Sequence, residues 1–289
     1  MSLRPDYVKV KLPGGENFTQ INHLLRESSL HTVCEEARCP NLSECWDSGT
    51  ATFMILGKNC SRGCRFCSVT HGGMEPLDPE EPRKVKESVR MMGLKYAVIT
   101  SVDRDDLVDQ GARHYAETIR EIKSIKVIVE ALIPDFQGRK DLLDIILESR
   151  PDVLAHNVET VRRLSPKIRD VRAGYDQSLE VLRHAKEKIP NLTTKSSIML
   201  GHGELDEEVI ETMDDLRKVN VDILTIGQYL RPSKKQIEVF EYSSMERFKN
   251  LEREAYKRGF RFVASGPLVR TSYRAFEGWA MKNITLNER

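Results

Sequence analysis

Short, nearly continuous apolar runs alternate with segments of helical periodicity from about residue 50 almost to the end of the 289-residue chain. Runs of this kind predict buried strands, and the segments between them predict helices. The expected strands are residues 52–57, 96–101, 126–132, 152–157, 194–200 and 222–227, and one further apolar run follows at 260–265. The expected helices lie near residues 79–92, 110–123, 138–149, 176–188, 205–219 and 244–258.

Six successive β-α units predict an α/β fold, specifically a partial (β/α)6 barrel that is similar to a TIM barrel. A doubly wound sheet is the alternative. In either fold the functional surface lies at the C-terminal ends of the strands. We expect residues 1–50 to form an irregular N-terminal extension, residues 51–265 to form the barrel, and residues 266–289 to form a separate C-terminal segment.

The balance of charge excludes some classes of partner. The chain has 45 basic and 44 acidic residues, so there is no electrostatic argument for binding nucleic acid or a membrane surface. The N-terminal sequence has no apolar core of a signal peptide, and no run of apolar residues is long enough to span a bilayer. We therefore expect a cytoplasmic protein, in which lasting disulfides are rare.

All six cysteines fall into two triads, Cys34-x4-Cys39-x5-Cys45 and Cys60-x3-Cys64-x2-Cys67. Six cysteines can pair in fifteen ways as disulfides, but the expected compartment argues against pairing. Zinc is another alternative, because His71 follows Cys67 and could complete a Cys3His tetrahedron. An iron–sulfur cluster is the third. Four irons held by three thiolates leave one iron open to bind a substrate or cofactor.

The second triad has a specific spacing. CSRGCRFC, with Phe66 before the last cysteine, closely resembles the cluster motif of the radical S-adenosylmethionine (SAM) superfamily. The resemblance implies a 4Fe-4S cluster on Cys60, Cys64 and Cys67, SAM bound to the open iron, and Phe66 beside the adenine. It also implies a radical SAM barrel, in which the motif follows the first strand.

Further SAM contacts follow from the same resemblance. Ser101 and Asp103 end the second strand, where the superfamily binds the SAM amino group. The usual Gly-Gly-Glu pattern is absent there, so capping or ion pairing is an equal alternative. SIMLGHGE is similar to the G-x-I-x-G-x-x-E stretch beside the adenine, in which Gly201 would allow close approach of the backbone. Glu204 either serves that site or caps a helix.

Two more residues are candidates for the ribose or carboxylate of SAM, namely Asn157 and Arg172. Arg172 could equally pair with a surface carboxylate. His156 and His202 are expected to be structural.

The first triad narrows the resemblance to one family. CEEARCPNLSECW closely resembles the auxiliary-cluster motif of the lipoyl synthase family, and similar segments follow in order over residues 25–280. In that family a serine of a C-terminal R-S-S-Y motif completes the cluster. Here the motif is Arg270-Thr271-Ser272-Tyr273, so threonine replaces the first serine and Ser272 occupies the ligand position. The implied second 4Fe-4S cluster is held by Cys34, Cys39, Cys45 and Ser272, and Glu35, Arg38 and Trp46 are expected to surround it.

The resemblance implies a particular reaction. Sulfur is inserted at C6 and C8 of an octanoyl chain attached to a lysine, the auxiliary cluster is the sacrificial sulfur donor, and two SAM molecules are used. The implied catalytic residues are Cys60, Cys64, Cys67 and Ser272. The implied partners are a lipoyl domain of a 2-oxoacid dehydrogenase or the glycine-cleavage H protein, a low-potential donor such as ferredoxin or flavodoxin, and a cluster-repair protein. A biotin synthase and a zinc-stapled binding module are the alternatives.

Overall fold

The computed structural model describes residues 52–272 and, before them, residues 5, 7, 19, 23, 25, 26, 30–36, 39, 41 and 42. The chain divides into two compact units. The N-terminal unit consists of Val10–Gly63 and Cys67–Asp152, and the C-terminal unit consists of Met1–Lys9, Cys64–Phe66 and Val153–Arg289. Each unit is described by itself.

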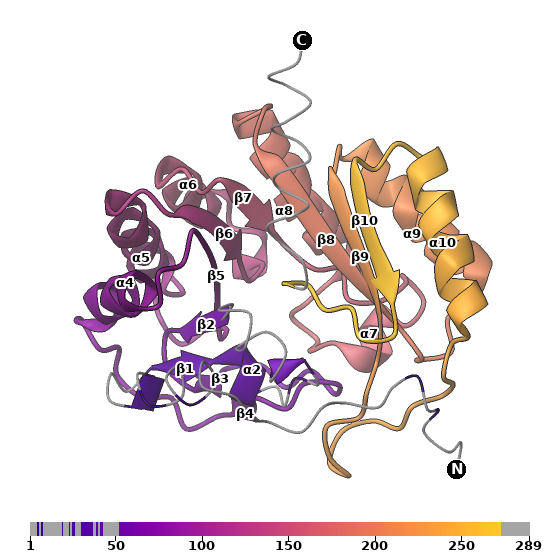
Figure 1. Ribbon diagram of the computed structural model, residues 1–289, viewed down its shortest axis with the longest axis horizontal. Coiled ribbons are helices and arrows are strands. Elements are labelled where there is room, and N and C mark those ends of the chain that lie inside the picture. The colour runs from indigo at the N-terminus through magenta and orange to yellow at the C-terminus, as the bar shows by residue number, and fades with distance from the viewer. Residues whose placement is uncertain are drawn as a thin grey trace. The chain divides into compact units, whose positions relative to one another are not determined.

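Parallel strands alternate with helices in the N-terminal unit (Figure 1). The parallel strands are β2 (Thr52–Ile55), β5 (Tyr96–Ser101) and β6 (Ile128–Leu132), and they alternate with the helices α4 (Glu81–Met91), α5 (Ala112–Ser124) and α6 (Lys140–Glu148). The register pairs Phe53 with Ile99 and Ile99 with Ala131, and all three side chains are buried. Helix α5 packs between α4 and α6 along the sheet.

Shorter elements complete this unit. They are β1 (His31–Thr32), which pairs antiparallel with β2, α2 (Val33–Glu36), the small parallel pair β3 (Asn59–Cys60) and β4 (Thr70–His71), and the 3-10 turn η2 (Phe136–Gly138).

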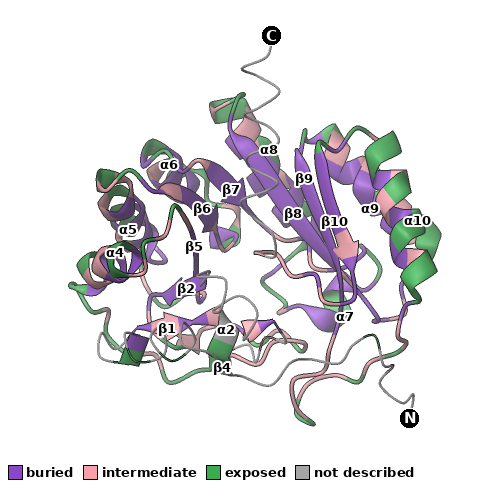
Figure 2. Cartoon of the chain, viewed as in Figure 1, coloured by how far each residue is buried: buried purple, intermediate pink, exposed green. Residues whose placement is uncertain are grey.

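The C-terminal unit continues the alternation. Its parallel strands are β7 (Val153–Ala155), β8 (Thr193–Leu200), β9 (Ile223–Gln228) and β10 (Phe262–Gly266). The helices are α7 (Ser165–Ile168), α8 (Tyr175–Lys188), α9 (Asp206–Lys218) and α10 (Met245–Lys257). All residues of β9 are buried, and the exposed faces of α9 and α10 point away from the strands (Figure 2). Strands covered on both faces explain the nearly continuous apolar runs.

The predicted alternation is confirmed. All six predicted strands and all six predicted helices are present, and the run at 260–265 forms β10, a further parallel strand beside β9. The predicted division at residues 50 and 265 stays a prediction, because much of the two ends lies outside the described residues. Among the helices in the described part of the chain, none is long and apolar enough to cross a bilayer.

Candidate cluster-binding and active site

The second cysteine triad lies on the loop that follows β2. Cys60 ends β3 and belongs to the N-terminal unit together with Cys67, whereas Cys64 belongs to the C-terminal unit. All three residues are half-buried. In the order of the chain, the triad therefore follows the first parallel strand, β2.

Hydrogen bonds surround the Cys60 sulfur. Its Sγ accepts the backbone N–H groups of Arg62 and Asp103, both at 3.4 Å, and lies 3.7 Å from Oδ2 of Asp103. The backbone N–H of Ser61 donates to the carbonyl oxygen of Asp103 at 2.9 Å. The loop is thus tied to the segment that follows β5, and N–H donors of this kind stabilise negative charge on sulfur.

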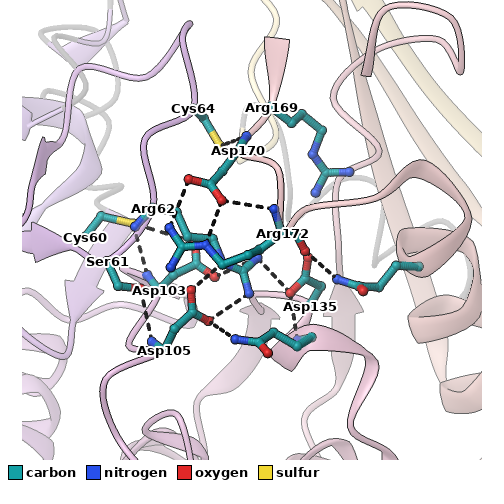
Figure 3. A network of polar contacts seen from close by, with 12 residues as sticks. Cys60, Ser61, Arg62, Cys64, Asp103, Asp105, Asp135, Arg169, Asp170 and Arg172 are labelled. Carbon is teal, nitrogen blue, oxygen red and sulfur yellow. Dashed lines mark hydrogen bonds and ion pairs between the residues drawn. The ribbon is translucent and has the colours of Figure 1, made fainter. Parts of the chain in front are cut away.

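A buried charge network lies behind Cys60 (Figure 3). The Arg62 guanidinium, whose side chain is 2% exposed, binds both carboxylate oxygens of Asp105 at 2.8 and 2.9 Å. It also contacts Asp135 Oδ1 at 2.8 Å and Asp103 Oδ1 at 3.3 Å. Burial alone would lower the pKa of Arg62, but Asp105 and the other aspartates raise it above its usual value. The guanidinium therefore stays charged.

The aspartates respond in opposite directions. Burial raises the pKa of Asp103 to about 6, and the charges of Asp135 and Asp105 add to this effect against that of Arg62. Burial also acts to raise the pKa of Asp105, but hydrogen bonds from Arg62, Gln137 and Ser61 lower it overall. Asp105 is therefore the carboxylate that carries the fixed charge opposite Arg62.

A strained turn presents Asp135. Phe136 and Gln137 adopt left-handed backbone conformations, with φ of +47° and +52°, which are unfavourable for residues with a side chain. The turn is held by the N–H of Gln137 on Asp135 Oδ1 and by the Gln137 side-chain amide on Asp105, both at 2.9 Å. Among the described atoms, Oδ2 of Asp135 is buried without a hydrogen-bond partner.

Sequence reasoning missed Arg62, Asp105 and Asp135. The available signal was an arginine between two cysteines of the motif and aspartates after two neighbouring strands. In SVDRDDL, however, the sequence does not show which aspartate pairs with which arginine.

Cys64 has its own anchor within the C-terminal unit. Its Sγ accepts the backbone N–H of Asp170 at 3.3 Å. The Asp170 carboxylate in turn accepts three bonds from Arg172, from the backbone N–H at 3.0 Å, from Nε at 2.8 Å and from Nη2 at 3.0 Å. The Arg172 side chain is 40% exposed. Arg172 thus makes the carboxylate pair that was its alternative role, with the residue whose N–H binds the Cys64 sulfur.

Two of the predicted SAM contacts have unsatisfied polar atoms. Ser101 Oγ, at the end of β5, is buried without a hydrogen-bond partner among the described residues. Asn157 donates to Glu159 at 3.1 Å and to Thr271 Oγ1 at 3.0 Å, but its Oδ1 is likewise buried without a described partner. Buried polar atoms without partners fit a missing ligand. Phe66 is half-buried in the C-terminal unit.

Two more of the predicted SAM contacts, Gly201 and Glu204, have structural roles in the turn after β8. The buried Glu204 accepts the N–H groups of Gly201 and His202 at 2.7 and 2.9 Å, so its carboxylate closes the turn after β8. Gly201 has φ of +108°, and a Cβ there would lie 2.2 Å from Gln228 Nε2. The close approach predicted at Gly201 is therefore made by Gln228 in this structure.

The two histidines lie in the C-terminal unit. His156 bonds Ser178 Oγ at 2.9 Å. His202 stacks on Tyr229 at 4.4 Å, and burial lowers the pKa of its imidazole to about 4. Close by lies an open cavity of about 440 Å³ that His202 lines together with Arg65, Leu164, Lys167, Ile168, Ile237, Glu238, Val239 and Phe240.

The auxiliary triad is only partly described. Cys34 lies in α2 and Cys39 is half-buried, whereas Cys45, Arg38, Trp46 and Tyr273 lie outside the described residues. Glu35 is exposed and bonds Thr32 at 3.1 Å.

The predicted serine ligand follows β10. Ser272 is half-buried in a turn of the C-terminal unit. The segment before it runs against β9, where a Cβ on Gly227 would lie 2.3 Å from the carbonyl oxygen of Val269. Ser272 is therefore held in a segment that packs closely on a strand.

The chemistry of the donor set, three thiols on one short loop, fits an iron–sulfur cluster. Across the described residues, which include Cys60, Cys64, Cys67 and His71, no three His, Cys, Asp or Glu side chains form a group that could hold one ion. In a cluster each iron takes its own thiolate, so the thiols need not converge on one point.

Comparison with known proteins agrees with this geometry. The model of the radical SAM superfamily matches residues 54–216, and the model of the N-terminal domain of lipoyl synthase matches residues 2–39. The solved structures of methylornithine synthase (PylB) and of the hydrogenase maturase HydG from Carboxydothermus hydrogenoformans share the fold. The methylornithine synthase structure has a TM-score of 0.58 at 16% identity, and the match covers 90% of this chain and 78% of that one. The HydG structure has a TM-score of 0.57 at 14% identity, and the match covers 80% of this chain and 66% of that one. The chain is thus a radical SAM enzyme with an α/β partial barrel and an N-terminal extension.

Curated relatives identify the family within that class. Lipoyl synthase of Picrophilus torridus is 65% identical over 96% of this chain and 97% of its own length. Lipoyl synthase of Sulfolobus acidocaldarius is 55% identical over 95% of this chain and 96% of its own length. The chain belongs to the lipoyl synthase family. It is therefore an enzyme of lipoyl cofactor biosynthesis that uses a 4Fe-4S cluster and SAM.

Proposed function

We propose that the chain inserts sulfur at C6 and C8 of an octanoyl group attached to a lysine of a lipoyl carrier protein. Two SAM molecules are consumed for each lipoyl group, and an auxiliary 4Fe-4S cluster is the sacrificial sulfur donor. The observation that carries this proposal is the presence of two separate cysteine triads in one radical SAM chain. SAM cleavage needs only the triad at Cys60, Cys64 and Cys67, so the other triad has a different task.

In this proposal each triad has a defined role. Cys60, Cys64 and Cys67 hold the cluster that binds SAM, and that pair of cofactors supplies a 5′-deoxyadenosyl radical able to attack unactivated C–H bonds. The N–H groups directed at the sulfurs of Cys60 and Cys64 support their role as thiolate ligands. The partnerless atoms of Ser101 and Asn157 support contacts to SAM, to which Phe66, Asp103, Arg172, Gly201 and Glu204 are further candidates.

Cys34, Cys39, Cys45 and Ser272 hold the auxiliary cluster. An oxygen ligand binds soft iron less well than a thiolate does, so the bond from Ser272 suits a cluster that must lose sulfide. The protein around both clusters has to place the octanoyl chain and exclude water, because a carbon radical reacts with whatever lies nearest.

The proposed carriers are lipoyl domains of 2-oxoacid dehydrogenases or the glycine-cleavage H protein. A low-potential electron donor such as ferredoxin or flavodoxin reduces the first cluster, and a repair protein rebuilds the second. The nearly balanced charge of the chain supports neither nucleic acid nor a membrane as a partner, and we propose a cytoplasmic location.

The first test is metal and sulfide analysis of the anaerobically reconstituted protein. We expect about eight irons and eight sulfides per chain, which corresponds to two 4Fe-4S clusters. Zinc without sulfide would contradict the proposal. About four irons would contradict the auxiliary cluster.

The second test separates the two triads with matched variants. With an octanoyl-lysine peptide as substrate, Cys60→Ala should abolish formation of 5′-deoxyadenosine. Cys39→Ala should keep it and stop sulfur insertion. Equal loss of SAM cleavage in both variants would contradict the division of roles.

A further inference from the structure

We propose that Arg62 is a positioning residue, which fixes the loop Asn59–Gly63 so that Cys60 is oriented for the cluster before the cluster arrives. This inference rests on the proposed role of Cys60 as a ligand. The cysteine spacing leaves the position of Arg62 unspecified, and the candidate SAM contacts do not include it. It lies between Cys60 and Cys64 with its side chain directed into the protein, 2% exposed.

The first step of the argument is the backbone around Cys60. Two N–H groups point at its Sγ, one from Arg62 itself and one from Asp103. Both donors belong to residues whose side chains are joined by the contact between Arg62 Nη1 and Asp103 Oδ1 at 3.3 Å. The two groups that orient the sulfur are therefore held together by the guanidinium.

The second step is the number of partners. Arg62 connects the cluster loop to Asp103 and Asp105 after β5 and to Asp135 after β6. One positive charge stands among three carboxylates, so without it these groups would repel one another in a buried place. The guanidinium is thus the group that lets two strand ends and the loop pack together.

The third step is the geometry of the donors. A planar guanidinium offers five N–H groups in a fixed fork, and here it uses Nε and Nη2 on Asp105 and Nη1 on Asp135. A lysine ammonium has the same charge but cannot bridge these positions in one plane. The conservative change Arg62→Lys therefore tests orientation while it retains the charge.

Ser61 strengthens the same connection. Its hydroxyl donates to Asp105 Oδ2 at 3.1 Å and accepts the Asp105 N–H at 3.0 Å. The turn that carries Asp135 is strained, which is typical of segments kept for function. Two independent features thus hold the aspartates where Arg62 meets them.

The structure also offers a matched control. Arg104 is as buried as Arg62, with 3% exposure, and it binds both oxygens of Asp106 at 2.9 and 2.8 Å and the carbonyl oxygen of Leu56 at 3.1 Å. None of these contacts involves the loop Asn59–Gly63. If Arg62 were only one more buried ion pair, Arg104→Lys would have the same consequences.

The test begins with the full-length apoprotein, by hydrogen exchange of peptides that cover residues 59–66. We expect the amides of this loop to exchange at least tenfold faster in Arg62→Lys than in wild type. Arg104→Lys should leave that rate unchanged although it also weakens the fold. The loop amides should exchange faster still in Arg62→Met than in Arg62→Lys. If Arg62→Met does not fold, the result for Arg62→Lys decides.

The second readout is the cluster itself. In a Cys34→Ala/Cys39→Ala/Cys45→Ala background, which leaves one triad, Arg62→Lys should retain at most half of the iron that the background itself retains after gel filtration. It should also change the electron paramagnetic resonance spectrum of the reduced cluster with SAM. Arg104→Lys should match the background in both respects.

The outcomes are distinguishable. Unchanged loop exchange in Arg62→Lys, or equal effects of Arg62→Lys and Arg104→Lys, would overturn the positioning role. So would faster exchange with full iron and an unaltered spectrum. Full iron in Cys60→Ala in the same background would instead overturn the assignment of Cys60 as a ligand, and with it the proposed function.

Discussion

The sulfurs of Cys60 and Cys64 receive the same kind of hydrogen bond but are supported by opposite kinds of surroundings. Cys60 is backed by an arginine that is 2% exposed and shared among three aspartates. Cys64 is backed by one aspartate paired with an arginine that is 40% exposed. A buried ion pair fixes geometry because water cannot replace its partners, whereas an exposed pair exchanges readily with solvent.

This difference indicates where rigidity is needed. On the Cys60 side the charges of Arg62 and Asp135 are buried in the protein, and the turn that carries Asp135 is strained. The Cys64 side leaves a guanidinium within reach of solvent, and therefore within reach of a ligand. The proposed contact of Arg172 to the SAM carboxylate is therefore compatible with its support of Asp170.

The strongest way to break the contrast is Arg62→Met. It leaves three carboxylates close together, of which Asp105 and Asp135 are nearly shielded from solvent, and we expect the free energy of unfolding of the apoprotein to fall by about 3–5 kcal/mol. Urea denaturation followed by circular dichroism measures the loss. A loss under about 1 kcal/mol would mean that water enters the network and that the ion pairs behind Cys60 and Cys64 stabilise the fold to a similar extent.

Acid should weaken the unit that holds Cys64 through His202. Folding lowers the pKa of this imidazole from 6.5 to about 4, so between these values the unfolded chain binds a proton that the folded chain does not. The stability that the neutral imidazole contributes is complete above about pH 6.5 and is lost as the pH falls toward 4, by at most roughly 1.4 kcal/mol per pH unit.

Urea denaturation of wild type and His202→Leu between pH 4.5 and 7.5 checks this expectation. The wild-type free energy should fall more steeply with acid than that of the variant. Parallel curves would show that folding does not lower the pKa of His202.

The smallest effect is expected for Arg172→Met, which removes the exposed partner of Asp170. We expect a loss of about 1 kcal/mol or less, and the loss should vanish in high salt because the pair is open to solvent. The Arg62→Met loss should persist in the same salt. A large, salt-independent loss of unfolding free energy in Arg172→Met would contradict the difference between the ion pairs behind Cys60 and Cys64.

The alternation of strands and helices could be predicted from the sequence because long elements leave a pattern. Runs such as residues 96–101 and 222–227 are buried on both faces, and their composition shows it. The strands β3 and β4 have two residues each, which is too short for any hydrophobic periodicity to show in the sequence. The strand that ends in Cys60 was therefore not predicted.

Only the residues of the site that belong to short sequence motifs could be predicted. The cysteines stand at a recognisable spacing, but the network behind them depends on pairing in space. In SVDRDDL, Asp103 and Asp105 turn to Arg62, whereas Asp106 turns to Arg104. Arg104 and the three aspartates occupy four consecutive positions, whereas Arg62 lies 43 residues before Asp105. Only the direction in which each aspartate side chain leaves the backbone decides which arginine it meets.

The close packing at Gly227 predicts how substitutions at this position behave in a mutational screen. Any side chain at this position would collide with the carbonyl oxygen of Val269 and displace the segment that ends in Ser272. Gly227 itself offers no side chain to a metal or to SAM. In a selection for growth that depends on lipoyl formation, substitutions at this glycine should nevertheless be lost as completely as substitutions of a cysteine, and a search for ligands by mutation alone would count it among them.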